Sequence, residues 1–358
     1  MTGAVVIEQQ LRELLADELP KRGLSHFGLT PLQRPLSFDL YRDWLDAGYH
    51  GDMQYLVEHA PIKEEPRRQW PRVHSALVFA MPYHPHPEPL ANWPLKQARV
   101  SLYAQGVDYH FWFRDRLREI AALLQQQFPQ EEFLCFTDSS PVLERDLARR
   151  AGIGWVGKNT CIIHPQKGSL FFLGEIYSSL SLQPNPQPAT NALMPDYCGT
   201  CTRCLDICPT QAIIEPRKLD ARRCISYLNI ESRKLAPVEL REGIGDWLFG
   251  CDLCQTVCPW NQKLFNQTLD VSLQQPLNET EQQALIADLR YLLTASGKRL
   301  EKDFHGTPLA RAGSFGLKRN ALVVVGNRKL VALKPEVAAL TSHDRLGELA
   351  QWALAALG

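Results

Sequence analysis

Eight of the ten cysteines in this chain fall between residues 198 and 258, at spacings typical of metal or redox sites. The first run reads Cys-x2-Cys-x2-Cys-x3-Cys-Pro, the arrangement of bacterial ferredoxins, and its tight loops turn successive thiolates into one pocket. A second run reads Cys-x2-Cys-x3-Cys-Pro, and a lone cysteine stands well before it. The eight residues are Cys198, Cys201, Cys204, Cys208, Cys224, Cys251, Cys254 and Cys258. Their spacing predicts two [4Fe–4S] clusters.

The ligands of the two predicted clusters are expected to cross over, because the fourth cysteine of a ferredoxin run ligates the other cluster. One cluster then takes Cys198, Cys201, Cys204 and Cys258, and the other takes Cys208, Cys224, Cys251 and Cys254. Two zinc sites, each with a full set of cysteine ligands, are the alternative, since zinc also binds thiolates at x2 spacing. Zinc sites do not usually need three cysteines in consecutive x2 steps, so the pattern favours clusters. The displaced Cys224 departs from the ferredoxin pattern.

Asp138 is the best candidate for acid–base chemistry, because it ends an expected buried strand, EEFLCFTD (131–138). Open α/β sheets bind ligands at such strand ends. An ordinary turn or helix-capping aspartate is the alternative, and on pattern alone it is favoured. Cys135 in the same strand is expected to be a packed thiol. The same holds for Cys161, although its place beside a Gly-Lys-Asn-Thr turn would also suit a reactive thiol.

Two further motifs suggest cofactors but fail in detail. Residues 152–157, GIGWVG, match the dinucleotide pattern G-x-G-x-x-G, which is meaningful only after a strand and before a helix. Here the order is helix and then strand, so we interpret the segment as a helix C-cap and a glycine-rich turn. Asp108-Tyr109-His110 begins like D-x-H-x-x-G, in which a histidine ligates the cobalt of cobalamin. Position 113 is phenylalanine, so no histidine ligand is expected.

Hydrophobic periodicity predicts the elements that position these residues. The expected elements are helices over 5–19, 111–128 and 139–152, strands over 75–83 and 131–138, and a β-hairpin over 160–180 that turns at 166–168. The third helix is expected to carry Pro141 at its first position. This order predicts an α/β layer for roughly residues 1–180.

The remainder of the chain divides at polar and proline-rich segments. QPNPQPATNALMP (183–195) is a proline-rich connector, and residues 280–358 have the composition of short packed helices, which we interpret as units of a helical repeat. We therefore expect an α+β fold of three domains. These are 1–182 (α/β), 183–265 (ferredoxin-like) and 266–358 (HEAT-like helical repeats).

Composition limits the class of protein. Apolar residues make up 45% and net charge is zero, which is ordinary for a soluble globular protein and argues against a general nucleic-acid coat. No segment approaches the ~20 apolar residues of a membrane helix, and the amino end lacks a secretory n-region, so we expect the cytoplasm. There the cysteines stay reduced. The charge is nevertheless uneven: Ser296 to Lys334 contains nine Lys or Arg and two acids.

Several blocks together resemble the epoxyqueuosine reductases. They are the block from Asp138 through SSPVLERDLARRAGIGWVGKNT, followed by GSLFFLGEIYSSL, YCGTCTRCLDICPTQAI and GCDLCQTVCPWN, together with the earlier SLYAQGVDYH. The resemblance covers about residues 5–330. It implies a reductase with two [4Fe–4S] clusters and cobalamin, which removes the epoxide oxygen of epoxyqueuosine at the wobble base of tRNA. It also implies an external electron donor of the flavodoxin or ferredoxin type.

The resemblance assigns roles to individual residues. Asp138 matches the proton-donating aspartate of the family, which reverses the preference for a turn residue. The expected cobalamin contacts are Gly157, Asn159, Thr160, Ile162, Ser226, Tyr103 and Asp108. Lys318 and Arg319, in the basic stretch, are the expected tRNA contacts. Two alternatives stay open: a corrinoid reductase of a small molecule, which needs no basic tail, and a non-catalytic electron-transfer module, which leaves residues 138–180 without a purpose.

We predict about eight irons and eight acid-labile sulfides per chain after anaerobic preparation, because eight thiolates complete two [4Fe–4S] clusters. Cys258→Ala is expected to damage the cluster bound by Cys198, Cys201 and Cys204, because the fourth ligands cross over. Metal and sulfide analysis, with electron paramagnetic resonance of the reduced protein, measures both outcomes. Stoichiometric zinc without sulfide would contradict the clusters, and loss of the other cluster alone would contradict the pairing.

Overall fold

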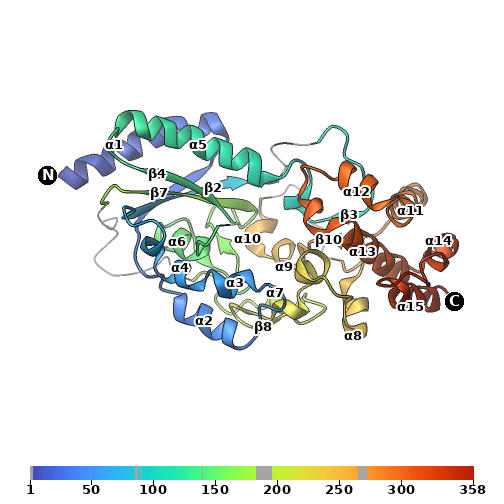
Figure 1. The fold of residues 1–358 in the computed structure, drawn as a ribbon. Helices are drawn as coiled ribbons and strands as arrows, with labels where there is room; N and C mark the ends of the chain where they lie inside the picture. Colours follow the sequence, from blue (N-terminus) through green and yellow to red (C-terminus); the bar gives the residue numbers. More distant parts are fainter. Residues whose placement is uncertain (1–2, 85–87, 89, 139, 183–195, 265–271) are drawn as a thin grey trace. The chain divides into compact units, whose positions relative to one another are not determined.

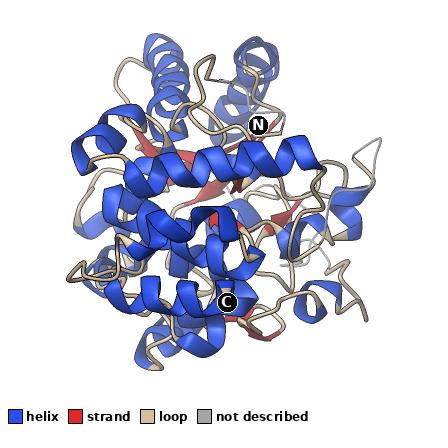
Figure 2. Ribbon diagram, turned by 90° about the vertical axis from the view of Figure 1, so that its right-hand side faces the viewer, coloured by secondary structure: helices blue, strands red, loops and turns tan. Residues whose placement is uncertain are grey.

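The structure is a computed structural model that describes the chain apart from residues 1–2, 85–87, 89, 139, 183–195 and 265–271 (Figure 1). The expected proline-rich connector, 183–195, lies outside the described residues. Helices account for more of the described chain than strands do (Figure 2). In the described residues, no helix combines the length and the apolar character that crossing a membrane requires.

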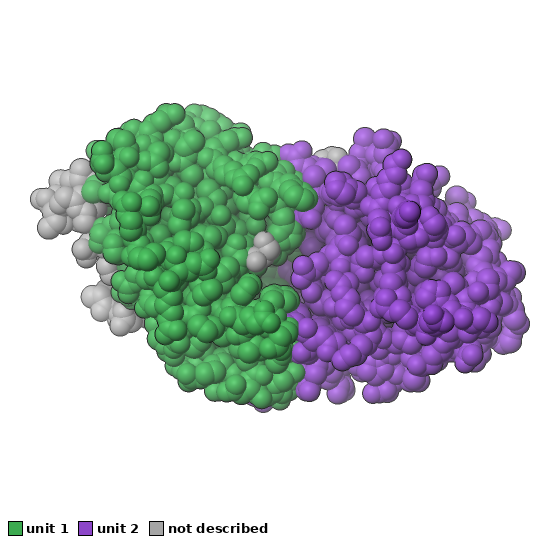
Figure 3. Space-filling model, viewed as in Figure 1, with its two compact units in different colours: residues 1–50, 54–87, 109–201 green, residues 51–53, 88–108, 202–358 purple. Residues whose placement is uncertain are grey.

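The chain forms two compact units, coloured separately in Figure 3. Unit 1 comprises residues 1–50, 54–87 and 109–201, and unit 2 comprises residues 51–53, 88–108 and 202–358. Unit 2 therefore holds the carboxy-terminal helices together with six of the eight clustered cysteines. The three domains expected from the sequence stay a prediction.

The described part of unit 1 contains the strands of one main sheet, a pair of short strands and several helices. They are α1 (Gly3–Glu18), β1 (His26–Pro31), α2 (Phe38–Asp46), α3 (Tyr55–Glu58), α4 (Ala60–Glu64), β2 (Ser75–Pro82), α5 (Tyr109–Gln127), β4 (Phe133–Thr137), α6 (Glu144–Arg150), β5 (Trp155–Val156), β6 (Ile162–Ile163) and β7 (Phe171–Ser178). The strands expected over 75–83 and 131–138 and the helices expected over 5–19 and 111–128 are confirmed.

The main sheet has the strand order β1-β2-β7-β4, and every neighbouring pair is antiparallel. The expected α/β layer is thus wrong in its strand direction, while the α+β class is right. Helices cover both faces (Figure 1). Gly174 of β7 lets α5 pack closely, because a Cβ there would lie 2.8 Å from side-chain carbons of Phe113 and Leu117. On the other face an apolar cluster joins Val78, Phe136 and Tyr177 to α6.

Two local predictions need correction. The helix expected over 139–152 begins only at Glu144, with Leu143 at its N-cap, so Pro141 precedes the helix. The hairpin expected over 160–180 keeps its turn, since His164 and Gly168 form a bridge. Its two arms belong to different sheets, because β6 pairs with β5 and β7 joins the main sheet.

The glycine-rich segment is a helix C-cap, as expected. Gly152 has φ of 78°, and the Ile153 N–H donates to the Ala148 carbonyl across the end of α6. Strand β5 follows within a few residues, and no helix opens there. A left-handed residue after the last helical turn suits glycine because it has no Cβ. The dinucleotide interpretation is excluded by this order of elements.

Unit 2 combines short elements around the cysteines with longer carboxy-terminal helices. Its described elements are β3 (Arg99–Val100), α7 (Arg203–Asp206), β8 (Ile213–Glu215), β9 (Lys218–Leu219), α8 (Val238–Arg241), β10 (Trp247–Phe249), α9 (Leu253–Thr256), α10 (Pro259–Gln262), α11 (Glu279–Thr294), α12 (Gly297–Asp303), α13 (Gly313–Arg328), α14 (Lys334–Ala338) and α15 (Gly347–Leu357). Helix α13 packs against α11, α12 and α15. A HEAT-like repeat in these helices stays a prediction.

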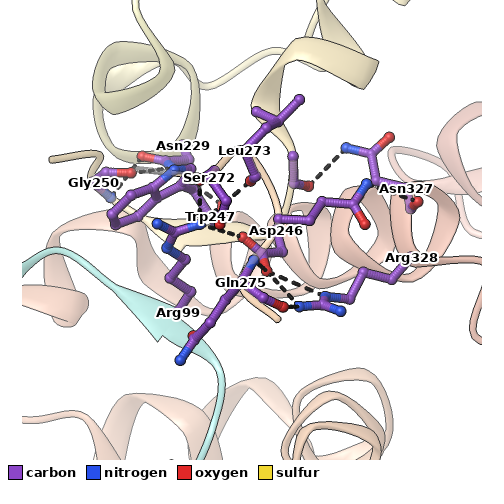
Figure 4. A network of polar contacts seen from close by, with 12 residues as sticks. Arg99, Asn229, Asp246, Trp247, Gly250, Ser272, Leu273, Gln275, Asn327 and Arg328 are labelled. Atoms are coloured by element: carbon purple, nitrogen blue, oxygen red, sulfur yellow. Dashed lines mark hydrogen bonds and ion pairs between the residues drawn. The ribbon is translucent and has the colours of Figure 1, made fainter. Parts of the chain in front are cut away.

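A buried ion network joins distant segments of unit 2 (Figure 4). Asp246 is 3% exposed and binds Arg99 at 3.0 Å and Arg328 at 2.8 Å. The Arg99 guanidinium also lies 4.0 Å from the ring centre of Trp247, and β3 pairs with β10 in parallel. Breaking a buried ion pair leaves an uncompensated charge, so this network fixes residues 88–108 to the later part of the chain.

Candidate functional site

Asp138 lies just beyond β4 and is held by two side chains from the start of α5. The Tyr109 hydroxyl donates to Asp138 Oδ2, and His110 Nε2 lies 2.5 Å from Asp138 Oδ1. The Tyr109 ring stacks on Phe172 of β7, with 4.1 Å between ring centres, which fixes the hydroxyl. The Asp138 side chain remains 38% exposed. A positioned and accessible carboxyl group of this kind suits proton transfer.

Two more carboxyl groups lie near Asp138. Glu144 opens α6 and is half-buried, and Glu175 is fully buried in β7. Burial, followed by the nearby charge of Asp138, raises the pKa of Glu144 to about 7. Burial also raises the pKa of Glu175 well above its usual range, and Glu144 and Asp138 add to this effect. Desolvation disfavours the charged form of an acid, and neighbouring negative charges do the same.

A tight turn at residues 157–161 follows β5. The Gly157 N–H donates to the Cys161 carbonyl at 2.8 Å, and the Thr160 N–H donates to the Gly157 carbonyl at 2.9 Å. Thr160 has φ of 71°, a conformation that β-branched residues rarely adopt. A Cβ at Gly157 would lie 2.4 Å from the end of the Ile163 side chain and 2.8 Å from the side-chain oxygen of Asn159, so the turn packs closely around glycine. The turn is therefore preformed.

This turn is tied to the loop that carries Cys198 and Cys201. Lys158 Nζ donates to the carbonyls of Gly199 at 2.6 Å and Cys201 at 3.0 Å. The indole N–H of Trp155 donates to Cys198 Sγ at 3.5 Å. Trp155 is 1% exposed, so this hydrogen bond is shielded from water. Hydrogen bonds to the sulfurs of a cluster are one of the factors that set its reduction potential.

Thiols of the second predicted ligand set gather within unit 2. The thiols of Cys208 and Cys224 lie close enough to that of Cys251 to interact with it electrostatically. Backbone N–H groups point at these sulfurs: Ala212 donates to Cys208 at 3.3 Å, and Ser226 donates to Cys224. Within the described parts of the chain, no three His, Cys, Asp or Glu side chains are grouped as ligands of one metal ion. None of the ten cysteines forms a disulfide.

The structure distributes the other predicted cofactor residues over both units. Gly157, Asn159, Thr160 and Ile162 lie in or beside the turn of unit 1, whereas Tyr103, Asp108 and Ser226 belong to unit 2. Asn159 and Ile162 are only 4% and 3% exposed. Their side chains therefore support the turn itself. The Asp108 N–H donates to the Gly306 carbonyl at 2.8 Å, and the Tyr103 ring lies near Phe249.

The prediction that Arg319 contacts tRNA is wrong in this structure. Arg319 is 2% exposed and donates to the carbonyls of Ser232 and Lys234, so its guanidinium group is not accessible to a nucleic acid. Lys318 is half-buried and donates to the Leu293 carbonyl at 2.9 Å. Three other cations of the basic stretch are in ion pairs: Arg299 with Asp303, Arg311 with Glu231, and Arg328 with Asp246. The composition of this stretch revealed its positive charge, but it could not reveal which of the cations are buried or paired.

Comparisons with known proteins identify the family of this chain. A family profile described as "4Fe-4S double cluster binding domain" matches residues 197–261, and one described as "Epoxyqueuosine reductase QueG, DUF1730" matches residues 63–139. The epoxyqueuosine reductase of Xanthomonas campestris pv. campestris is 39% identical, over 94% of this chain and 93% of its own length. That of Escherichia coli is 36% identical, over 93% and 86%. The chain belongs to the epoxyqueuosine reductase family.

Solved epoxyqueuosine reductases have the same fold. The Bacillus subtilis enzyme, solved with its catalytic aspartate loop swung out of the active site, aligns with a TM-score of 0.80 and 28% identity, covering 98% of this chain and 91% of that one. An epoxyqueuosine reductase with an epoxyqueuosine-modified tRNA stem loop gives 0.79 and 27%, with the same coverage. The present reductase is thus an oxidoreductase with a [4Fe–4S] double-cluster domain, and the zinc alternative is set aside.

Several residues of this reductase were not predicted from the sequence in their observed roles. His110 was considered only as a cobalt ligand, whereas the structure pairs it with Asp138 together with Tyr109. The sequence Asp108-Tyr109-His110 was the feature that could have indicated this pairing. The buried position of Glu175 could have been suspected because an acidic residue stands in the middle of an apolar strand sequence. Cys135 is a packed thiol as expected, since burial raises its pKa to about 11.

We predict that Trp155→Phe lowers the reduction potential of the cluster that Cys198 ligates, because it removes an N–H that stabilises the added negative charge. A redox titration followed by electron paramagnetic resonance measures the shift. The second cluster is the internal control, since its expected ligands all lie in unit 2. An unchanged potential for the first cluster would show that the indole hydrogen bond has no electrostatic effect.

Proposed function

We propose that this reductase converts epoxyqueuosine at the tRNA wobble position to queuosine, with electrons passing from the [4Fe–4S] clusters to cobalamin and with Asp138 as proton donor. The observation that carries the proposal is the accessible Asp138 carboxyl, held by Tyr109 and His110. Two solved relatives support the proposed substrate and the proposed proton donor. One was solved with an epoxyqueuosine-modified tRNA stem loop, and the other has a catalytic loop that carries an aspartate.

Reducing an epoxide to an alkene and water takes two electrons and two protons. Iron–sulfur clusters deliver electrons singly, so a further carrier is needed. Cobalamin, when bound, supplies a two-electron cobalt nucleophile, and that chemistry belongs to the cofactor. The external source of electrons is proposed to be a flavodoxin- or ferredoxin-type protein.

The turn at residues 157–161 fits a corrinoid for two reasons. Its backbone is preformed, and Thr160 is held in a strained left-handed conformation of the kind that gathers at ligand sites. Lys158 and Trp155 also join the turn to the loop of Cys198 and Cys201, a link that supports electron transfer from that cluster to a corrinoid at the turn. The turn would hold the cofactor mainly by its backbone, because Asn159 and Ile162 are buried. Tyr103, Asp108 and Ser226 remain proposed contacts.

Asp138 is not the N-cap of α6, since Leu143 takes that position. Helix α6 starts at Glu144, so the partial positive charge of its first turn lies several residues beyond Asp138. The groups that orient the carboxyl are Tyr109 and His110. His110 Nε2 is engaged with Asp138, so this ring acts in the proposal by positioning the carboxyl. Asp138 can then deliver its proton to the epoxide oxygen as the C–O bond opens.

Exposed lysines replace Lys318 and Arg319 as the proposed tRNA contacts. Lys298 and Lys302 are exposed, lie one turn apart on α12, and form no ion pair with the described residues. Lys329, after α13, is also exposed. Phosphate contacts hold a nucleic acid and make its binding depend on salt, while a flipped base is recognised in the active site.

We predict that Asp138→Asn keeps both clusters and cobalamin but lowers turnover by about 10²–10⁴-fold, the usual contribution of a positioned general acid. Turnover of epoxyqueuosine-containing tRNA by the fully loaded enzyme is the measurement. Asp115→Asn is the matched control, because Asp115 is an exposed aspartate of α5 that pairs with Arg118 on the helix surface. Near-normal turnover by Asp138→Asn would remove Asp138 from the reaction.

We predict that Lys298→Ala combined with Lys302→Ala weakens tRNA binding and reduces its salt slope by roughly 0.7–0.9 per lost contact. Binding is measured across a salt series. Arg12→Ala with Lys21→Ala removes the same charge from unit 1 and serves as control. If the α12 variant binds tRNA like the unaltered enzyme at every salt concentration, these lysines do not hold RNA. If the unaltered enzyme binds no tRNA at all, a corrinoid reductase of a small molecule becomes the better proposal.

A further inference from the structure

Glu175 is an acid placed where none is expected. It is 0% exposed, and neither of its carboxyl oxygens has a hydrogen-bond partner among the described residues. It lies in β7, paired with Val78 of β2 on one side and with Phe136 of β4 on the other. Both of these neighbours belong to the apolar cluster under α6. An unpaired carboxylate in such a place is very costly, so the group is held neutral and keeps its proton.

The sheet register directs this acid toward Asp138. Phe136 is directly opposite Glu175, and Asp138 comes two residues after Phe136, where β4 has just ended. Phe136 packs in the apolar cluster with α6, and side chains directly opposite each other on paired strands share a face, so Glu175 also points to the side of the sheet that α6 covers. Glu144, the first residue of α6, lies on this same side. The charges of Asp138 and Glu144 both raise the pKa of Glu175, and that of Asp138 raises the pKa of Glu144, so the three carboxyls lie within electrostatic range of one another.

The charged groups around these acids do not neutralise Glu175. Lys63, His110 and Arg145 act on Glu144, and Tyr177 is the titratable neighbour of Glu175 on β7. Arg150 of α6 is occupied, because it donates to the carbonyls of Pro31 and Gln33. Burial and the neighbouring acids therefore favour the protonated form of Glu175, and its side chain makes no hydrogen bond with the described residues.

The reaction explains why a second acid is useful. The proposed reduction consumes two protons per epoxide, and Asp138 holds only one. The first proton goes to the epoxide oxygen as one C–O bond opens, and the second goes to the resulting hydroxyl, which leaves as water when the other C–O bond breaks. The two electrons come from the clusters, as proposed above. Asp138 must therefore be reprotonated while the tRNA base is in the site.

We propose that Glu175 and Glu144 store the second proton of each turnover and return it to Asp138 after the epoxide has opened. The inference rests on the proposed function of Asp138. Glu144 is the intermediate member, since it is half-buried at the start of α6 and interacts with both other acids. Glu175 never touches the substrate in this scheme and acts only through its neighbours.

The experiment compares Glu175→Gln and Glu144→Gln with the unaltered, cofactor-loaded enzyme on epoxyqueuosine-containing tRNA. Glutamine keeps the shape of glutamate but carries no exchangeable acid proton. Turnover is expected to fall roughly tenfold, less than for a directly acting general acid. Because the Glu144 pKa is about 7, turnover of the unaltered enzyme should decline as pH rises through 7, and Glu144→Gln should lack that step. Ser75→Ala, which alters an unpartnered buried hydroxyl in the same sheet, is the control and should turn over normally.

A readout independent of turnover tests the proton directly. Infrared spectroscopy in H2O and D2O should show the C=O band of a protonated carboxylic acid at neutral pH, and Glu175→Gln should remove it. Glu175→Met is a second variant in case the glutamine amide disturbs folding, because replacing a buried acid by an apolar group is often neutral or stabilising. Normal turnover and pH dependence in both Glu175 variants would overturn the proposal. Loss of the Asp138 effect would instead overturn the proposed function.

Discussion

The pairing of β4 with β7 is the constraint on which the proposed active site depends. This antiparallel register brings Phe136 opposite Glu175 and ends β4 at Thr137, so that Asp138 emerges beside the start of α5. There the Tyr109 hydroxyl and the His110 ring hold it. A slip of one residue would turn every β4 side chain to the opposite face of the sheet. The donor, its two partners and the buried acid would then no longer meet.

In the proposed function, one short segment of unit 1 links the proton donor to the electron path. Helix α6 begins with Glu144 and ends at Arg150, and the left-handed Gly152 just after it leads the chain into β5 and the turn at 157–161. That turn reaches the Cys198–Cys201 loop through Lys158 and Trp155. The segment therefore carries a carboxyl at one end and a contact to a predicted cluster loop at the other.

The sequence predicted what depends on spacing and missed what depends on side-chain contact. Cysteine spacing indicated the clusters, and the apolar spacing of Phe113, Leu117, Ile120 and Leu124 indicated α5. The start of α6 was misplaced because Ser140 and Pro141 imitate an N-cap and a first helical residue. The contacts of Tyr109 and His110 with Asp138 join residues far apart in the chain, and no local pattern encodes them. Arg319 was assigned to the surface because a charged residue carries no sign of its burial, which here depends on carbonyls of Ser232 and Lys234.

The discontinuity of unit 2 has a consequence for how the protein is made. Residues 88–108 interrupt unit 1 in the sequence but belong to unit 2. They contact residues much later in the chain: Arg99 pairs with Asp246, which is 147 residues further along (Figure 4). On a ribosome that adds about 5–20 residues per second, β3 waits on the order of ten seconds for β10 to appear. Unit 1 can close around its sheet earlier, with this segment extruded as an open loop. During that interval Arg99 has no Asp246 to pair with, so residues 88–108 can join unit 2 only after residue 246 has been synthesised.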